Sequence, residues 1–413
     1  MRARALELLP RAIEHDLANG DAGNLFDSLA NAVGQCMDPR HPLFAELVRR
    51  ALEARITQGI GRGQSDEAFA GVAETAVGTL MSAGVRVADL WLLVAAYHAH
   101  YDNGGERRRR SIRKAVESSQ DALERLRAEL ILAKFHIDTS EYRAAHSVLD
   151  GCENLMRRSR DTDRYRADLH CSRAMSYFYA DSGRAEELFR QAIQEAEPYR
   201  DDPDVAQSAA QAHHYLGRLA YSRGEFGEAI EQYLEAQELS TGRLTGRGFH
   251  HLRIAEILIE YGEQDEAYYH LNECAYFFRR VYQVSNGEAQ LDHASARWEL
   301  KAGRPDKAFE LLESALGKAA GTSFSRGVIQ YSFELARLHL SHRRPFRAFR
   351  LLWRAAVTLL VTELIENGRP AFGKIRTILT LVPHIGVVPR RSRPRPQVAC
   401  TCGADHVRPR VWT

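Results

Sequence analysis

The sequence predicts an all-α fold, a right-handed solenoid in which antiparallel helical hairpins stack one after another. Six alanines recur at intervals of 40, 44, 38, 41 and 40 residues. They are Ala145, Ala185, Ala229, Ala267, Ala308 and Ala348. A second small residue precedes each by eleven or twelve positions: Ala133, Ala174, Gly217, Ala255, Ala296 and Ala336. Such pairs at a fixed period are typical of stacked hairpins, because antiparallel helices approach closely only where a side chain is small. Almost every segment has helical periodicity, and no convincing alternating strand pattern occurs.

Residues 1–87 carry three or four amphipathic helices without clear repeat marks, so we expect an N-terminal helical bundle or cap. A solenoid needs its exposed ends covered, which favours a cap. The nearest candidate for a DNA-binding helix-turn-helix is the stretch 29–50, but Pro39 and Pro42 stand where its turn would be. DNA binding through this region is therefore weakly supported.

Residues 88–125 predict one degenerate helical hairpin. Trp91, Val94 and Ala95 imitate the first-helix positions of a repeat, and residues 102–105 form the turn. The second helix of this hairpin would carry three apolar residues, Ile112, Val116 and Leu123.

Residues 126–366 predict about six hairpin repeats. Short turn signals separate the two small residues of several repeats, at residues 181–183, 223–225, 261–263 and 302–304. Four residues after each recurring alanine stands a larger side chain, which we expect to fill the groove against the next hairpin. These larger residues are Leu149, Phe189, Tyr233, Leu271, Leu312 and Leu352.

Residues 367–382 predict a final capping helix, and residues 383–413 a disordered tail rich in Pro and Arg. Residues 384–413 hold six Arg and one Asp, a net charge of +5. Four of these arginines suit an acidic partner or a phosphate backbone, although a purely solvating tail is the alternative. They are Arg390, Arg391, Arg393 and Arg395.

Several function classes have no signature in the sequence. The phosphate-binding loop, the HExxH zinc helix and the GxSxG nucleophile elbow are all missing. We therefore expect no enzyme, no cofactor and no metal site. The net charge of +2 gives no global attraction to nucleic acid. The longest apolar run, 90–97, falls far below the roughly 18 residues of a membrane span.

Cysteines scattered through helical segments fit buried thiols in a reducing cytoplasm. They are Cys36, Cys152, Cys171 and Cys274.

The repeats resemble the tetratricopeptide repeat family. That family places small residues at repeat positions 8, 20 and 27 and a bulky one at position 24. Position 27 is small in all six repeats here: Cys152, Ala192, Ala236, Cys274, Ala315 and Ala355. The period departs from the usual 34 residues, and the proline that ends a repeat is mostly missing, with Pro198 the nearest match. Lengthened repeats of this kind look like those of bacterial sensor domains and Gram-positive peptide receptors.

The resemblance implies that the first helices line a concave groove, with position 9 facing into it. Position 9 is basic in four of six repeats, at Lys134, Arg218, Arg297 and Arg337, and it is Met175 and Glu256 in the other two. Neighbouring groove positions add His214, His293, Phe178 and Tyr221. Arginines and aromatic rings would suit an extended peptide with acidic side chains or a free carboxylate. The alternative is that these basic residues pair with Glu from neighbouring helices.

We expect a non-enzymatic cytoplasmic scaffold or adaptor that binds a protein or peptide segment, possibly an acidic one, in this groove. Two alternatives remain open: a peptide-sensing regulatory protein, transcriptional or signalling, and a repeat protein that binds nucleic acid through the groove and tail. The sequence names neither the partner nor the oligomeric state.

Overall fold

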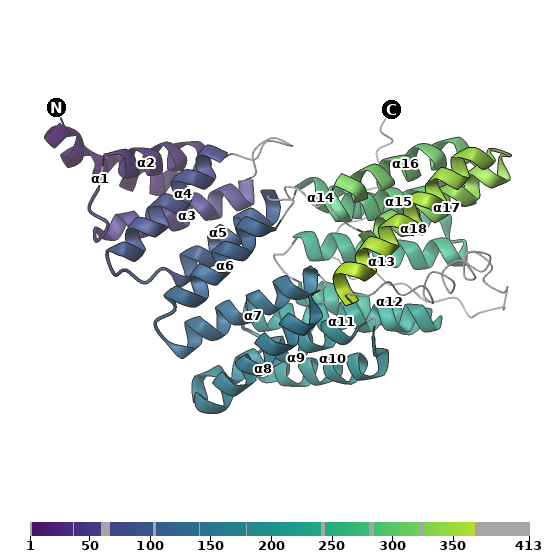
Figure 1. Ribbon diagram of the computed structural model, residues 1–413, viewed down its shortest axis with the longest axis horizontal. Helices are drawn as coiled ribbons and strands as arrows, with labels where there is room; N and C mark the ends of the chain where they lie inside the picture. The colour runs from purple at the N-terminus through teal and green to yellow at the C-terminus, as the bar shows by residue number, and fades with distance from the viewer. Residues whose placement is uncertain are drawn as a thin grey trace.

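The computed structural model describes residues 2–35, 37–58, 67–101, 105–139, 141–178, 180–240, 244–280, 285–321 and 325–367. Every regular element in these residues is a helix, as predicted (Figure 1). The first six helices are α1 (Arg2–Asn19), α2 (Ala22–Gly34), α3 (Pro42–Gln58), α4 (Glu67–Ser82), α5 (Ala88–Tyr101) and α6 (Glu106–Ser118). Helices α1 to α5 surround one apolar core that contains Phe44, Phe69, Trp91 and Tyr97.

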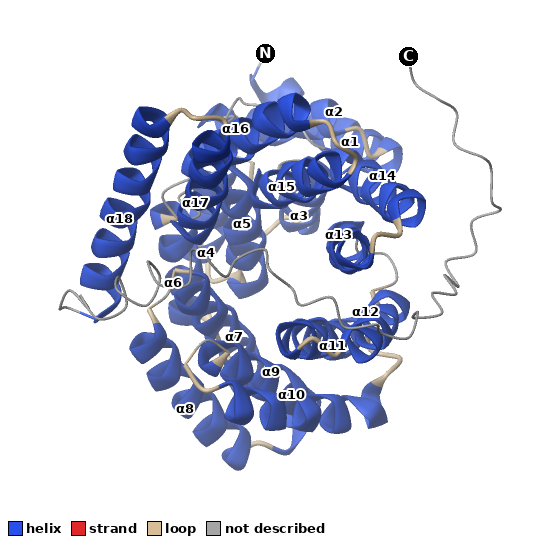
Figure 2. Cartoon of the chain, turned by 90° about the vertical axis from the view of Figure 1, so that its right-hand side faces the viewer, coloured by secondary structure: helices blue, strands red, loops and turns tan. Residues whose placement is uncertain are grey.

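The remaining helices form consecutive antiparallel pairs that stack into a solenoid. They are α7 (Ala122–Asp138), α8 (Tyr142–Arg158), α9 (Arg166–Tyr177), α10 (Ser182–Ala196), α11 (Pro203–Arg223), α12 (Phe226–Leu239), α13 (Leu244–Tyr261), α14 (Gln264–Arg280), α15 (Ser285–Lys301), α16 (Pro305–Gly321), α17 (Ser325–Ser341) and α18 (Pro345–Asn367). Two short 3-10 helices, Arg160–Tyr165 and Glu197–Tyr199, lie between hairpins. The first helix of each hairpin faces the middle of the arrangement and the second lies outside it (Figure 2).

The small residues of the repeat lie where the two helices of a hairpin meet. All twelve, the recurring alanines and their preceding partners, are buried. The larger side chain four residues later is buried in the first five repeats and half-buried at Leu352 in the last. The repeat register predicted from the sequence is therefore confirmed by burial. Leu352 is more exposed because no described helix follows α18.

Glycine ends the first helix of three hairpins, where the sequence predicts turns. Gly224, Gly262 and Gly303 adopt left-handed backbone conformations, with φ of 78°, 85° and 77°. Glycine has no Cβ to clash in this region. At the equivalent turn between α17 and α18, Arg343 adopts φ of 56° instead.

The two helices of one repeat approach each other closely at Gly217, so we expect this position to be sensitive to substitution. A Cβ at Gly217 would lie 2.6 Å from Cε1 and 2.9 Å from Cδ1 of the buried Tyr233 ring. We therefore expect Gly217→Ala to lower the free energy of unfolding by about 1–3 kcal/mol. Gly71→Ala in α4 is the matched control, because a Cβ there meets nothing within 4 Å. It should stabilise the protein by about 0.5–1 kcal/mol. Urea unfolding followed by circular dichroism measures both, and equal effects would contradict the packing.

Three further predictions concern the cysteines, the C-terminal segment and the absence of a membrane span. Cys152, Cys171 and Cys274 are buried free thiols, as expected, and burial raises the pKa of Cys171 to about 12. Apart from Asn367, the predicted capping helix at 367–382 lies outside the described residues, as do the tail arginines, Arg390, Arg391, Arg393 and Arg395. Among the described helices, none combines the length and apolarity that crossing a bilayer requires.

Candidate functional site

The inner face of the solenoid carries a connected set of polar side chains, which we name the polar ladder. Its members come from the first helices of four successive hairpins, α11, α13, α15 and α17. They are Tyr221, Arg253, Glu256, Glu260, Gln290, His293, Arg297 and Glu334. The first helices have this inner position because their small residues let the outer helix pack closely against their other side.

Two arginines join neighbouring rungs of the ladder. Arg253 Nη1 lies 2.6 Å from Glu256 Oε2 on the same helix, and Arg253 Nη2 donates to Gln290 Oε1 on α15. Arg297 pairs with Glu260 on α13 and also hydrogen-bonds Tyr221 on α11. Each guanidinium therefore ties one hairpin to the next.

His293 and Glu334 make the last rung. His293 Nε2 lies 2.8 Å from Glu334 Oε2, and the imidazole stacks on the Tyr331 ring with centroids 4.7 Å apart. Burial alone would lower the pKa of His293, but the charge and hydrogen bond of Glu334 outweigh it and raise the pKa. Burial likewise opposes ionisation of Glu334, yet His293 lowers the pKa of Glu334 to about 2. The two residues form an ion pair that is strongest when both are charged.

A second group of predicted residues, which is separate from the polar ladder, packs against aromatic rings. The Arg218 guanidinium lies over the Phe178 ring at 4.7 Å and over the Tyr215 ring at 5.3 Å. His214 faces the rings of Tyr233 and His250, with centroids 5.5 and 5.4 Å away. Burial, then the charges of nearby groups, hold the pKa of His214 well below its usual value. His214 is therefore neutral and belongs to the packing between hairpins.

Lys134 lies apart from both groups, in a hollow of about 430 Å³ between α7, α9 and the start of α11. Lys134 Nζ lies 2.6 Å from Asp168 Oδ1, and Arg164 Nη1 lies 3.4 Å from Asp202 Oδ2. Arg127 and Asp204 also line the hollow. Three basic and three acidic side chains therefore alternate here, so the hollow suits a ligand that carries both charges.

The structure brings some of the predicted groove residues together and separates others. His293, Arg297 and Tyr221 share the ladder, and Phe178 stacks with Arg218, whereas Lys134 lies in its own hollow. Arg337 is exposed on α17. The alternative that basic residues pair with acids of neighbouring helices describes Lys134 and Arg297.

Sequence reasoning missed four members of the ladder, namely Arg253, Glu260, Gln290 and Glu334. A usable signal existed, because the partners across hairpins stand about one repeat apart. The separations are 37 residues for Arg253 and Gln290, 37 for Glu260 and Arg297, and 41 for His293 and Glu334. Residues of opposite charge, or a donor and an acceptor, that stand one repeat apart on successive first helices therefore predict contacts between hairpins.

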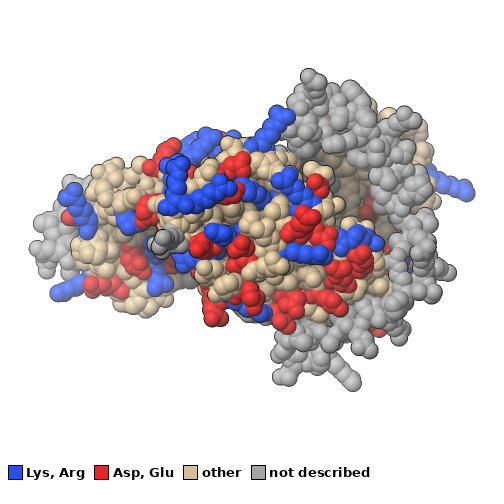
Figure 3. Space-filling model, turned by 90° about the horizontal axis from the view of Figure 1, so that it is seen from below, with Lys and Arg blue, Asp and Glu red and all other residues tan. Residues whose placement is uncertain are grey.

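The surface charges and the histidines limit the chemistry of the site. On the face that Figure 3 shows, Lys and Arg are interspersed with Asp and Glu across the described surface. No group of three or more His, Cys, Asp or Glu in the described part of the chain is arranged to hold a metal ion. The contacts described above on the inner face are ion pairs, hydrogen bonds and contacts with aromatic rings.

Comparisons with known proteins show the fold. No family model and no curated protein matches the sequence. Among solved structures, the Rap conjugation gene regulator of the plasmid pLS20, in complex with the Phr* peptide, is 13% identical with a TM-score of 0.54. That likeness covers 84% of this chain and 97% of the regulator. Aspartyl phosphate phosphatase F from Bacillus subtilis is 11% identical with a TM-score of 0.50, over 82% of this chain and 94% of the phosphatase. The predicted fold, a solenoid of stacked antiparallel helical hairpins, is thereby confirmed.

Proposed function

We propose that the chain is a non-enzymatic peptide-binding protein that holds an extended peptide segment along its inner face. The observation that carries this proposal is the polar ladder, which repeats fixed hydrogen-bonding groups on successive hairpins. The Rap regulator with the same fold was solved with a peptide, which adds support from a distant neighbour.

The spacing of the ladder fits an extended main chain. Packed helices stand about 10 Å apart, and an extended peptide advances about 3.3 Å per residue. Every third peptide residue would therefore meet a new hairpin. A guanidinium has five N–H donors, and the side chains of Arg253 and Arg297 are partly exposed, at 18% and 24%. The ladder can thus donate to peptide carbonyls while its own ion pairs keep the side chains in place.

The ion pair of His293 and Glu334 argues for a binding role of the inner face and against a catalytic one. A general acid or base needs a pKa near the working pH, whereas Glu334 has a pKa of about 2 because His293 holds its charge. Burial raises the pKa of Cys171 to about 12, which keeps that thiol protonated and unreactive. We therefore assign the buried charges of the inner face to recognition.

Panning a displayed random-peptide library on the full chain tests the proposal. Peptides should be enriched, and the double variant Arg218→Gln, Arg297→Gln should bind them at least about tenfold more weakly. Glutamine keeps a polar group at both positions, so the variant should keep its helical circular dichroism, although Arg297→Gln should lower its stability because Glu260 loses its ion pair. The measurement is fluorescence anisotropy with one enriched peptide.

A matched control lies on the outer layer. Arg190 on α10 is exposed, and among the described residues its ion pair is with Glu186 of the same helix. Arg190→Gln should leave peptide affinity unchanged. Equal affinity of wild type and the Arg218, Arg297 double variant would refute inner-face binding, as would a failure to enrich any peptide.

A peptide-responsive regulator is the second candidate, and one observation favours it. The likeness to the Rap regulator extends over 97% of that chain. In this chain the core around α1 to α4 continues through α5 and includes Ala128 of α7. A peptide bound on the inner face could therefore change the packing of α1 to α4. Amide hydrogen exchange with the enriched peptide separates the two candidates, because a scaffold should show protection on the inner helices alone.

A further inference from the structure

The last described helix exposes a stripe of large apolar side chains. Phe346, Phe349 and Trp353 on α18 are 91%, 68% and 64% exposed, and Val357 and Val361 continue the stripe. These residues follow one another at helical spacings, so they share one face of α18. A contiguous exposed apolar face is typical of a docking surface.

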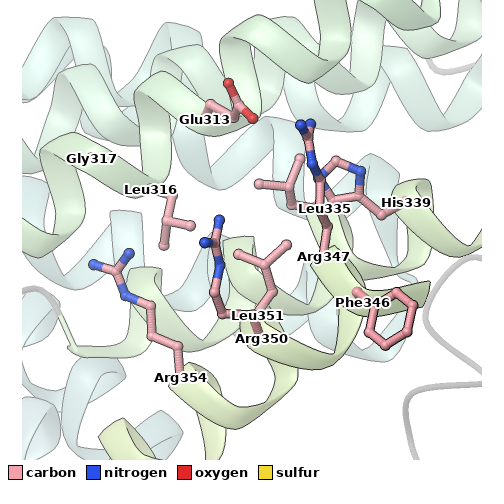
Figure 4. Close-up of a pocket in the computed structure, with 10 residues that line it drawn as sticks. All are labelled: Glu313, Leu316, Gly317, Leu335, His339, Phe346, Arg347, Arg350, Leu351 and Arg354. Atoms are coloured by element: carbon pink, nitrogen blue, oxygen red, sulfur yellow. The ribbon is translucent and has the colours of Figure 1, made fainter. Parts of the chain in front are cut away.

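A basic cleft adjoins this stripe. It has a volume of about 860 Å³ and lies between α16, α17 and α18. Leu316, Leu335 and Leu351 line it together with three arginines of α18, Arg347, Arg350 and Arg354 (Figure 4). The spacing of three and four residues places the guanidinium groups along one side of the helix. We name the cleft and the stripe together the C-terminal cleft.

The three arginines differ from those of the inner face in having no acidic partner. Arg297 and Arg253 are ion-paired, whereas none of Arg347, Arg350 and Arg354 forms an ion pair with a described residue. Glu313 is the one carboxylate among the residues that line the cleft. The cleft therefore has an excess of positive charge next to an uncovered apolar stripe.

Charge complementarity selects the occupant. Residues 368–413, which include most of the predicted capping helix, hold nine Lys or Arg and one Asp, a net charge of +8, so this segment has the same sign as the cleft. A symmetric contact between two copies of α18 would bring the arginine rows together. A nucleic-acid backbone would meet Glu313 and an aliphatic floor. An acidic segment with its own apolar face satisfies both the arginines and the stripe.

From these observations we infer that the C-terminal cleft binds an amphipathic, acidic helix of another protein. The stripe from Phe346 to Val361 spans 15 residues of helix, or roughly 22 Å at 1.5 Å per residue, so the bound helix has about four turns. Its apolar face covers Phe349, Trp353 and Val357, and its carboxylates pair with the arginines in the manner of helix-in-groove recognition. This surface lies on the terminal hairpin and is independent of the inner-face function proposed above.

The test uses the full chain and a designed probe of about 16 residues. The labelled probe is amphipathic as a helix, with leucines on one face and glutamates beside them, and its control has glutamine in place of glutamate. Anisotropy should show the glutamate probe binding at least about tenfold more tightly than the glutamine probe, with the difference shrinking at high salt. Because Arg347, Arg350 and Arg354 are exposed, the triple variant Arg347→Gln, Arg350→Gln, Arg354→Gln should fold normally and lose that preference.

The inner-face variant Arg218→Gln, Arg297→Gln is the matched control and should bind the probe as wild type does. If the inner-face variant loses the preference for the glutamate probe, the probe binds the inner face and the inference is overturned. If peptide panning fails but the probe results hold, the inner-face proposal fails and the C-terminal cleft is still supported. The inference is overturned if the full chain binds both probes equally, or if the triple variant keeps the preference. It is also overturned if an oligothymidylate binds the cleft more tightly than the glutamate probe, or if sedimentation shows a dimer that Trp353→Glu dissociates.

Discussion

Lowering the pH from about 7 to about 5 should destabilise the hairpins α11 to α14 by about 4–6 kcal/mol. The cause is a cluster of buried neutral histidines. Burial, followed by the charge of Arg247, lowers the pKa of His250 to about 3. Burial, then the neighbouring His270 and Arg247, lowers that of His251 to about 3. Burial alone lowers the pKa of His270 to about 4.

The direction of the pH effect on stability depends on whether the folded or the unfolded chain binds more protons. Near pH 5 the unfolded chain protonates these histidines, whose usual pKa is 6.5, while the folded chain does not. Stability is therefore complete above about pH 6.5 and falls as the pH decreases, by about 2 kcal/mol for each histidine at pH 5. The geometry agrees, because His251 Nδ1 and His270 Nδ1 lie 2.9 Å apart. One ring must donate and the other accept, so a second proton abolishes the bond.

Amide hydrogen exchange at the two pH values, corrected for intrinsic rates, locates the effect. Helices α13 and α14 should lose protection at low pH. Helices α15 and α17 serve as an internal control, because the raised pKa of His293 makes its bond to Glu334 fully present below pH 6.5. His251→Gln should reduce the pH dependence by about 2 kcal/mol. Uniform loss of protection over all helices would assign the acid effect elsewhere.

The packing of the repeats could be predicted from the sequence because it is local. Gly217 and Tyr233 belong to one hairpin, and a small residue opposite a large one leaves a periodic mark in the chain. Helix caps and turns leave similar marks, as Gly224 and Gly262 do. The fold class follows from such marks without knowledge of any contact between repeats.

The partners of the polar side chains could not be predicted from the same marks. Whether Arg297 faces a ligand or Glu260 depends on the rotation between successive hairpins, which the repeat period does not encode. The uncovered stripe on α18 was missed for a related reason. Phe349 and Trp353 occupy ordinary apolar positions of a helix, and only the absence of a following described helix makes them a surface.

Replacing Arg253 by methionine should destabilise the protein by about 3–5 kcal/mol, one of the two largest effects expected here. The Arg253 and Glu256 side chains are largely buried, with Nη1 and Oε2 2.6 Å apart. Burial would raise the pKa of Glu256, but the charges of Arg253 and Arg297 outweigh it and lower the pKa. Arg253→Met leaves Arg297 as the remaining counter-charge and also leaves Gln290 Oε1 without its donor.

The double variant Arg253→Met, Glu256→Leu separates a lost ion pair from lost packing. Because an apolar pair has no buried charge to compensate, the double variant should recover most of the stability that Arg253→Met loses. The deficit of the single variant should also shrink below pH 5, since Glu256 without Arg253 takes up a proton more readily. Urea unfolding of the four members of the cycle measures the coupling. Additive losses would mean that Arg253 stabilises the inner face by its packing alone, and the ladder would then be a row of neighbours without electrostatic coupling.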